Sequence, residues 1–367
     1  MTPPHSEHGC WEWAACGASV TGSQHLRHGK GCDDAYGYAL TDDFIAAVVA
    51  DGAGSVTGTS AWGAYAACQS VLDSVLRSDF LADMRIASEA DAEPIMRAIF
   101  DAALGRVSRQ AELMGASVTQ LATTLCVAVA TPELTVFGQI GDGIIVSATD
   151  GRVETHLMEE KSEYANATWF LQSGGALEQS FRTSAHTGVS AFALSTDGMA
   201  YKITNIITGE PYEPFFTGSW HNVLSGMSAA DFAALLRGIK DDQTGDDKTM
   251  VLAALQWVED AFYPSARPRR TTIVGSPPPP ALSTSAVHPS QHAQPECTPA
   301  LDSDARSIVD QGILLDGDEP ETEPSHVIAG VHRLDAAATG TYAPHELGAG
   351  PTRETKRRWR ARHRRYQ

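Results

Sequence analysis

The sequence lacks the features that mark membrane, secreted and disulfide-rich proteins. No apolar stretch reaches the roughly 18 residues that a bilayer span needs. The N-terminus, MTPPHSEHGCWEWAACG, has no basic start followed by an apolar run. We therefore expect a cytoplasmic protein. No CxxC pair occurs among the six cysteines, so neither a zinc site nor a compact disulfide framework is indicated. We expect reduced thiols, most of them packed as small apolar side chains, with Cys126 in the core.

Motifs of several enzyme classes are also missing. The chain has no phosphate-binding P-loop, no GxSxG nucleophile elbow and no HExxH metal-binding helix. An internal repeat of the solenoid type is absent as well. Any chemistry must therefore come from another arrangement of side chains.

Charge is distributed unevenly along the 367 residues. The formal net charge is −18, yet residues 351–367 contain eight Arg and Lys and one Glu, so residues 1–350 carry about −25. This acidic balance disfavours nucleic acid as a partner of the body of the protein. In the basic tail, Trp359 and Tyr366 among the arginines suit nucleic acid, an anionic membrane surface or the acidic body itself, and a merely solvated tail is also open.

Composition divides the chain into three parts. Residues 1–260 are dense in periodic apolar segments and predict one folded domain. From Pro264 the sequence becomes rich in Pro, Ser, Ala and Thr, and it buries too little apolar surface to offset the chain entropy. We expect residues 261–350 to form a mostly disordered linker, and residues 351–367 a separate basic tail.

Within the predicted domain, segments with a strand pattern are interrupted by two consecutive segments with a helical period. Strands are predicted over residues 11–20, 35–40, 44–50, 123–130, 134–140, 144–149, 152–158, 191–195 and 250–255. Helices are predicted over residues 60–76, with Ser60 as the cap, 93–114, with Leu113 in its apolar stripe, and 229–239. Asp150-Gly151 signals a hairpin. This order predicts an α+β sandwich and not a parallel βαβ sheet.

Acidic residues recur at the ends of the predicted strands. The sites are Asp33-Asp34, Asp51-Gly52, Gly141-Asp142-Gly143, Asp197-Gly198 and Asp246-Asp247. Each one alone fits ordinary turn chemistry, because Asp and Gly suit turns. Five such turns in one domain exceed what turn chemistry requires.

Carboxylates collected in this way suit hard divalent cations. Mg²⁺ and Mn²⁺ prefer oxygen ligands and take only a few carboxylates each. Two such ions about 3.5–4 Å apart can share a bridging carboxylate and generate a nucleophile from water near neutral pH. The sequence therefore predicts a two-metal centre, with a set of simple solvated turns as the alternative.

The order of the motifs resembles the metal-dependent type 2C serine/threonine protein phosphatases. The resemblance covers roughly residues 11–257 and rests on Asp33-Asp34-Ala35, Asp51-Gly52-Ala53-Gly54, Gly141-Asp142-Gly143, Ser195-Thr196-Asp197-Gly198 and Asp246-Asp247-Lys248-Thr249. The stretch EYANATWFL, residues 163–171, is similar to one in a bacterial branch of that family. The resemblance implies two packed antiparallel sheets flanked by helices, with Mn²⁺ or Mg²⁺ ions in a cleft at one edge.

The resemblance also implies roles for individual residues. Asp51 bridges two metal ions, and the carbonyl of Gly52 ligates one of them. Asp197 and Asp246 hold the first metal, while Asp34 acts on the side of the second metal, mainly through bound water. Asp51, Asp34 and Asp197 are thus the implied catalytic residues.

Four further residues have weaker assignments. The resemblance implies that Asp142 serves a third, weaker metal site. Asp33 lies next to Asp34, so it can lie near the second metal, but a simply solvated side chain explains it equally well. Asn166 and Thr168 are expected to be structural hydrogen-bonding residues, with a substrate role as the alternative.

Two departures from the family pattern concern substrate handling. Many members carry an arginine that grips the substrate phosphate at the position of Gly29. A nearby basic residue can substitute, and the sequence leaves open which one: His25, Arg27, His28 or Lys30. Some eukaryotic members have a histidine as a proposed general acid at the position of Ala53, so leaving-group protonation falls to a metal-bound water or another group.

The implied activity is hydrolysis of phosphoserine and phosphothreonine in proteins, by a metal-activated water that attacks phosphorus in line. The implied partners are a phosphorylated protein substrate and a cognate Ser/Thr kinase or its targets. The alternative from another class is a catalytically weak or silent phosphoprotein-binding regulator, a pseudophosphatase. The two departures favour this alternative, whereas the complete set of metal-site aspartates argues against it.

Overall fold

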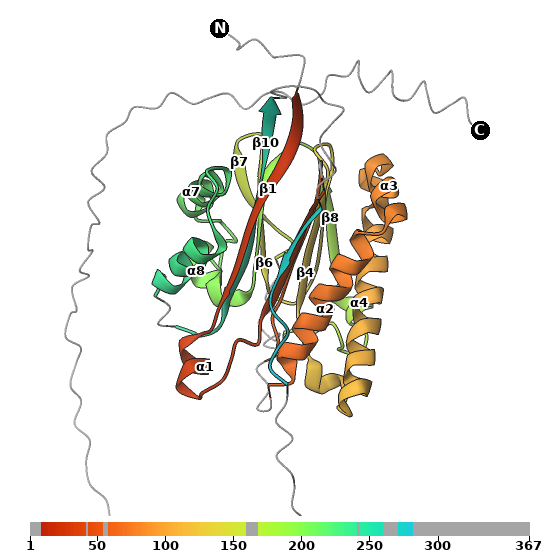
Figure 1. Ribbon diagram of the computed structural model, residues 1–367, viewed down its shortest axis with the longest axis vertical. Helices are drawn as coiled ribbons and strands as arrows, with labels where there is room; N and C mark the ends of the chain where they lie inside the picture. The colour runs from red at the N-terminus through yellow and green to blue at the C-terminus, as the bar shows by residue number, and fades with distance from the viewer. Residues whose placement is uncertain are drawn as a thin grey trace, which may run out of the picture. The chain divides into compact units, whose positions relative to one another are not determined.

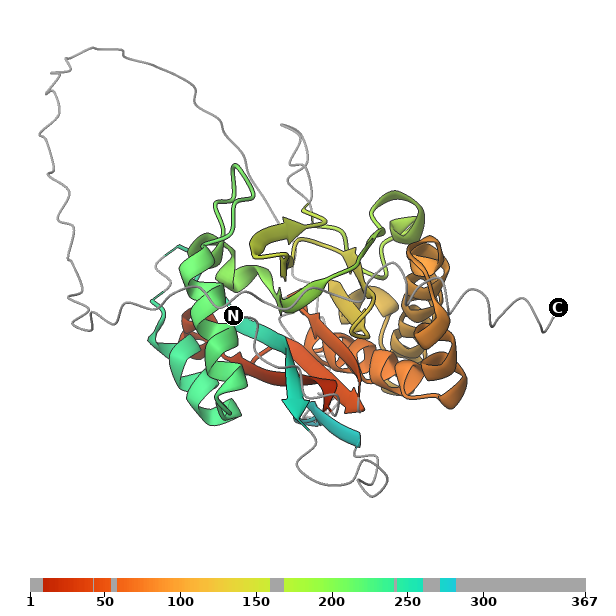
Figure 2. The same cartoon turned by 90° about the horizontal axis from the view of Figure 1, so that it is seen from above.

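The computed structural model describes residues 9–41, 43–53, 58–158, 168–240, 243–259 and 271–281. In these residues two antiparallel sheets pack face to face, and helices cover both outer faces (Figures 1 and 2). The predicted α+β sandwich is therefore confirmed. No helix in the described ranges combines the length and apolar character that crossing a bilayer requires.

The first sheet has five strands. Their order is β1 (Gly9–Val20), β10 (Lys248–Glu259), β9 (Val189–Ser195), β6 (Ile144–Thr149) and β7 (Arg152–His156). The two long strands β1 and β10 pair along their whole length, from Gly9 opposite Glu259 to Val20 opposite Lys248. Asp150 and Gly151, with φ of 51° and 78°, form the predicted turn between β6 and β7.

The second sheet has six strands. Their order is β11 (Thr271–Gly275), β2 (Ala35–Thr41), β3 (Phe44–Ala50), β4 (Leu125–Ala130), β5 (Thr135–Ile140) and β8 (Arg182–His186). The sequence pattern did not predict β8 and β11. Strand β11 pairs with β2 although it lies in the segment that composition assigns to the linker. The rest of residues 261–350, apart from 276–281, and the whole basic tail lie outside the described residues, so the domain limits stay a prediction.

Helices form the two outer layers. Helices α2 (Ser60–Val75), α3 (Ser78–Ile86) and α4 (Ala92–Met114) lie on the side of the second sheet, and α7 (Glu213–Leu224) and α8 (Ala229–Gly238) on the side of the first. The short helices are α1 (Ser23–Arg27), α5 (Ala176–Gln179) and α6 (Ala200–Ile203).

Two details of the helix predictions are wrong. Ser60 does not cap α2, because it is the first helical residue and its hydroxyl donates to Asp33. Leu113 is not in the apolar stripe of α4, since 84% of it is exposed. The buried face of α4 runs through Met96, Phe100, Ala103, Val107 and Ala111, residues spaced by three and four positions.

Three apolar cores hold the layers together. One lies between the two sheets, around Phe137 and Phe192, and the other two lie between each sheet and its helices. Cys126 is 1% exposed and belongs to the core between the sheets, as predicted. The five described cysteines are free thiols. The packed layers thus fix where the strands end, and the acidic turns lie at those strand ends.

Candidate functional site

Four of the five predicted acidic turns contribute a side chain to one cavity of about 240 Å³. These side chains are Asp51 after β3, Asp142 between β5 and β6, Asp197 after β9 and Asp246 before β10. Gly52 lines the same cavity. Adjacent antiparallel strands alternate in direction, so the end of one strand lies beside the start of its neighbour. The sandwich therefore gathers residues that lie far apart in the sequence.

Asp51 is held by its backbone at the end of β3. Its N–H donates to Thr124 Oγ1 at 3.0 Å, and its carbonyl accepts from the Thr124 N–H at 2.8 Å and from the Thr123 hydroxyl at 3.0 Å. These bonds fix the direction in which the short side chain leaves the strand.

The electrostatic environment of Asp51 is strongly negative. Burial raises the pKa of its carboxyl well above the usual value, and the charges of Asp34, Asp197, Asp246 and Asp142 raise it further. A divalent cation would relieve this repulsion, because an ion between carboxylates stabilises their ionised forms. The donor set, which consists of carboxylate oxygens with the nearby Gly52 carbonyl, fits a hard cation such as Mg²⁺ or Mn²⁺.

Asp33 and Asp34 lie at the start of β2 and are not among the cavity-lining residues. Asp34 is 8% exposed and accepts from Thr196 Oγ1 at 2.8 Å. Burial, and then the charges of Asp247 and Asp197, raise the pKa of Asp34 well above its usual value. Asp33 is 4% exposed and accepts from the Ser60 hydroxyl at 3.3 Å. It is therefore not the simply solvated acid that the sequence left open.

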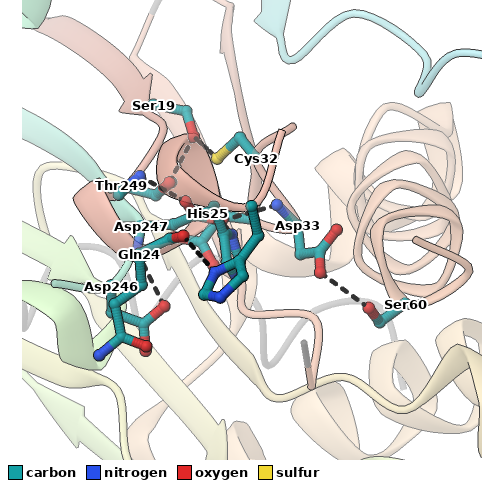
Figure 3. Close-up of polar contacts among 12 residues, drawn as sticks. Ser19, Gln24, His25, Cys32, Asp33, Ser60, Asp246, Asp247 and Thr249 are labelled. Carbon is teal, nitrogen blue, oxygen red and sulfur yellow. Dashed lines mark hydrogen bonds and ion pairs between the residues drawn. The ribbon is translucent and has the colours of Figure 1, made fainter. Parts of the chain in front are cut away.

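The adjacent residues Asp246 and Asp247 have different surroundings. Asp246 lines the cavity, whereas Asp247 is 2% exposed and accepts three hydrogen bonds. Its Oδ1 accepts from the Gly22 N–H at 2.6 Å. Its Oδ2 accepts from the Asp33 N–H at 2.7 Å and from His25 Nδ1 at 2.9 Å (Figure 3). Asp247 thus joins three segments of the site.

Close backbone packing around this pair requires glycine at two positions. A Cβ at Gly198 would collide with the backbone oxygen of Asp247, and a Cβ at Gly22 would collide with the backbone of Asp246. The Asp-Gly sequence after β9 therefore serves packing as well as the turn.

The four basic candidates for phosphate binding are in different places. Only His25 is among the described residues that line the cavity. The guanidinium of Arg27 donates to the carbonyl and the hydroxyl of Ser23, and His28 Nδ1 donates to the Gln24 carbonyl at 2.7 Å. Lys30 is half-buried, and its charge acts on Asp33, where it opposes the rise in pKa that burial causes.

Thr168 and Phe170 line the cavity on the side of Asp142. The Thr168 hydroxyl donates to Asp142 Oδ2 at 2.8 Å, which agrees with the structural role expected for Thr168. Asn166 lies outside the described residues, as does Gly54 of the second motif. Ala53 lines the cavity without a polar side chain.

Three residues of the site had no role assigned from the sequence. Gln24 and Phe170 line the cavity, and Asp247 organises the segments behind it. His25, Asp246 and Asp247 also form a group whose potential ligand atoms all lie within 4.8 Å of one another. The Asp246-Asp247 pair was visible in the sequence, but strand alternation alone did not show which of the two faces the cavity.

Sequence comparison places this arrangement among known proteins. The model of the family described as Protein phosphatase 2C matches residues 21–237. Serine/threonine-protein phosphatase 3 of Escherichia coli (strain K12) is 27% identical over 266 residues, which cover 67% of this chain and 99% of that protein.

Several solved structures are similar to this chain. A bacterial serine phosphatase covers 65% of this chain and 96% of its own, with 15% identity and a TM-score of 0.46. PppA of Pseudomonas aeruginosa covers 67% and 98%, with 19% identity and a TM-score of 0.42. The catalytic domain of the serine/threonine phosphatase PstP, solved with two manganese ions, covers 67% and 99%, with 16% identity and a TM-score of 0.41. On the match over residues 21–237, the chain belongs to the protein phosphatase 2C family and is thereby a phosphoprotein phosphatase.

Proposed function

We propose that this protein hydrolyses phosphoserine and phosphothreonine in proteins at a centre of two divalent metal ions, Mn²⁺ or Mg²⁺. One observation carries the proposal. Asp51 lies in a cavity with Asp142, Asp197 and Asp246, and its pKa is raised both by burial and by these neighbours. Such a cluster of carboxylates calls for cations.

The proposed ligands are the residues that the family resemblance implies, and four of their side chains line the cavity. Asp51 would bridge the two ions, the Gly52 carbonyl would ligate one, and Asp197 and Asp246 would hold the first. Asp34 would act on the side of the second ion from behind the cavity wall, and Asp142 would serve a weaker third site. When bound, the ions would supply the positive charge that activates an attacking water and neutralises the phosphoryl oxygens.

The chain's own residues would hold this geometry rigid. Thr123 and Thr124 fix the backbone of Asp51, and Thr196 fixes the carboxylate of Asp34. Thr168 orients Asp142. Rigid positioning of the ligands is what a site needs in order to act on the transition state without reorganisation.

The proposal is tested with Asp51→Asn and Asp197→Asn, with Asp79→Asn as the matched control. Asp79 lies on the exposed surface of α3, where it pairs with Arg77. We expect each cavity variant to lose more than about 100-fold of Mn²⁺-dependent hydrolysis of a phosphoserine peptide, because loss of a ligand weakens the metal site. Calorimetry with Mn²⁺ should show weakened binding in the same variants. Full activity in both cavity variants would overturn the mechanism.

A pseudophosphatase is the second candidate, favoured by Gly29, where many family members carry an arginine, and by Ala53, where some eukaryotic members carry a histidine. It predicts binding of a phosphoprotein without turnover. If the unmodified protein binds phosphopeptide but fails to hydrolyse it at saturating Mn²⁺, this candidate replaces the first.

The finer biological setting is also part of the proposal. A phosphorylated protein would be the substrate, a Ser/Thr kinase or its targets would be partners in signal transduction, and the location would be cytoplasmic. Nucleic acid would enter only through the basic tail, residues 351–367, which lie outside the described residues.

A further inference from the structure

The cavity contains one basic side chain among its described lining residues. The titratable side chains that line it are four acids, Asp51, Asp142, Asp197 and Asp246, and one base, His25. A phosphoryl group is anionic, so the carboxylates repel it unless cations intervene. His25 is therefore the side chain whose chemistry best matches the substrate rather than the metal ions.

The orientation of His25 is set by Asp247. Its Nδ1 lies 2.9 Å from Asp247 Oδ2, and the two side chains are 14% and 2% exposed (Figure 3). Asp247 is not among the residues that line the cavity, whereas His25 is. With Nδ1 bound to Asp247, the ring nitrogen left to face a ligand is Nε2.

The carboxylate that orients His25 is itself held in place. The N–H groups of Gly22 and Asp33 both donate to it. The Gln24 N–H also donates to the Gly245 carbonyl at 2.8 Å, which ties α1 to the turn that carries Asp246. The position of His25 is thus coupled to the backbone of a proposed metal ligand without His25 having to bind the metal.

Three other hydrogen-bond donors among the described lining residues have acceptors within the protein. The side-chain amide of Gln24 donates to the Thr244 carbonyl at 2.5 Å, and the Thr168 hydroxyl donates to Asp142. The Ala53 N–H donates to the Ala122 carbonyl at 3.0 Å. His25 Nε2 is thus a side-chain donor, among the described lining residues, that a phosphoryl oxygen can engage.

We propose that His25, as an imidazolium whose Nδ1–H donates to Asp247, donates a hydrogen bond from Nε2 to a phosphoryl oxygen of the substrate, and that Asp247 is its positioning residue. The inference rests on the proposed phosphatase function and deepens it. It selects one of the four basic candidates and gives Asp247 a role separate from that of Asp246. A histidine held by a buried carboxylate is a recurring way to fix a ring for work on a substrate.

An aspartate at position 247 suits this role better than an asparagine. Three N–H donors converge on two carboxylate oxygens. An asparagine presents one oxygen and one NH₂ group, so at least one donor would face another donor. Asp247→Asn should therefore loosen His25 even though it changes the side-chain volume little.

The test compares His25→Gln with His28→Gln and His221→Gln in the full-length protein loaded with Mn²⁺. His28 lies next to α1 but points to the Gln24 carbonyl, and His221 lies on the surface of α7. Three quantities are measured: inorganic phosphate affinity by calorimetry, Mn²⁺ affinity by calorimetry, and kcat and KM for a phosphoserine peptide.

We expect His25→Gln to weaken phosphate binding about 10- to 100-fold, as for loss of a hydrogen bond to a charged group. KM should rise correspondingly, and Mn²⁺ affinity should stay the same. His28→Gln and His221→Gln should leave all three quantities unchanged. Asp247→Asn should follow His25→Gln, and His25→Gln alone decides the case if Asp247→Asn does not fold.

Two results would overturn the inference. Unchanged phosphate affinity and KM in His25→Gln would remove His25 from the substrate. A loss of Mn²⁺ binding in His25→Gln would make it a metal ligand, an outcome that the His25, Asp246 and Asp247 group makes testable. Absence of Mn²⁺-dependent hydrolysis in the unmodified protein is a different result, because it would refute the proposed function itself.

Discussion

Two regions of the molecule bring titratable groups of one kind together in partly buried surroundings, and each region relieves the repulsion between them differently. At the cavity, the charges of four other acids, Asp34, Asp197, Asp246 and Asp142, act on Asp51. Between the sheets, His156 of β7 in one sheet touches His186 of β8 in the other, with ring centroids 4.3 Å apart. The acids can ionise together if cations bind, whereas the histidines avoid repulsion by staying neutral.

The histidine pair is built into the packing between the sheets. The ring of His156 stacks on Phe137 with centroids 5.2 Å apart, and its Nε2 shares a hydrogen bond with the Ser147 hydroxyl at 2.7 Å. Burial, and then His186, lower the pKa of His156 from 6.5 to about 4. Burial also lowers the pKa of His186, although Glu154 and Glu89 oppose this.

This difference shows which property makes a cluster of titratable groups indicate a functional site. The histidines fill their space with aromatic and hydroxyl partners, and their neutral form satisfies them. Asp51, Asp142, Asp197 and Asp246 line an open cavity, and repulsion between their ionised forms remains until something positive binds. A perturbed pKa thus points to a site where the group also faces a cavity that can admit a ligand.

The contrast between the acidic cavity and the histidine pair predicts its largest effect in the response of stability to metal. We expect saturating Mn²⁺ to stabilise the protein by about 3 kcal/mol at a concentration 100 times its Kd. Asp51→Asn should lose this gain, yet its metal-free form should be about 1 kcal/mol more stable than the unmodified metal-free form, because one repelling charge is gone. Thermal unfolding with Mn²⁺ and with EDTA measures both.

Asp79→Asn again serves as the control, since the carboxylate of Asp79 is exposed, pairs with Arg77 and does not line the cavity. It should keep the full response to Mn²⁺. If Asp51→Asn instead destabilises the metal-free protein, the cluster is not under electrostatic strain and the comparison with the histidines fails.

Much of the fold could be predicted because the pattern was local. Strand β3 is a continuous apolar run that is buried throughout, and the Asp150-Gly151 turn has the positive φ values that its sequence favours. The missed elements had weak local patterns. Helix α3 buries only Met84, and β8 is half-buried at every position. Helix α7 begins next to two prolines, at 211 and 214, which read as a loop.

The candidate site was predictable in part for the same reason. Each acidic turn follows or precedes a strand, so its position at a sheet end could be inferred from the chain alone. The contact between His25 and Asp247 joins residues that are 222 positions apart, and the choice among four basic residues depends on it. Only tertiary structure could show that contact, or the pairing of His156 with His186.

A smaller effect concerns pH and the histidine pair. The folded-state pKa of His156, about 4, lies below its ordinary value of 6.5, so the unfolded chain takes up the proton more readily. The stability that this group supports is therefore complete above about pH 6.5 and is lost as the pH falls toward 4. At pH 5 we expect a loss of about 1–2 kcal/mol relative to pH 7.5, allowing for the partial exposure of the ring.

Urea unfolding at pH 7.5 and pH 5 measures this loss. His156→Gln should show a smaller difference between the two pH values, because glutamine stays neutral and can still bond to Ser147. The exposed His221→Gln should keep the difference of the unmodified protein. An equal pH response in His156→Gln would place the acid sensitivity elsewhere.

The smallest expected effect distinguishes the contribution of the contact between the His156 and His186 rings from that of the hydrogen bond between His156 and Ser147. Ser147 is 1% exposed, so Ser147→Ala should leave His156 Nε2 without its buried partner and destabilise the protein by about 1 kcal/mol at pH 7.5. Ser190→Ala is the control, since the Ser190 hydroxyl donates its hydrogen bond to the Ala148 carbonyl and not to either histidine. Burial and His186, not Ser147, lower the pKa of His156, so Ser147→Ala should keep most of the difference between pH 7.5 and pH 5. If Ser147→Ala abolishes that difference, the hydroxyl and not the surroundings of the ring keeps the histidine neutral, and the contrast with the acidic cavity would rest on one hydrogen bond.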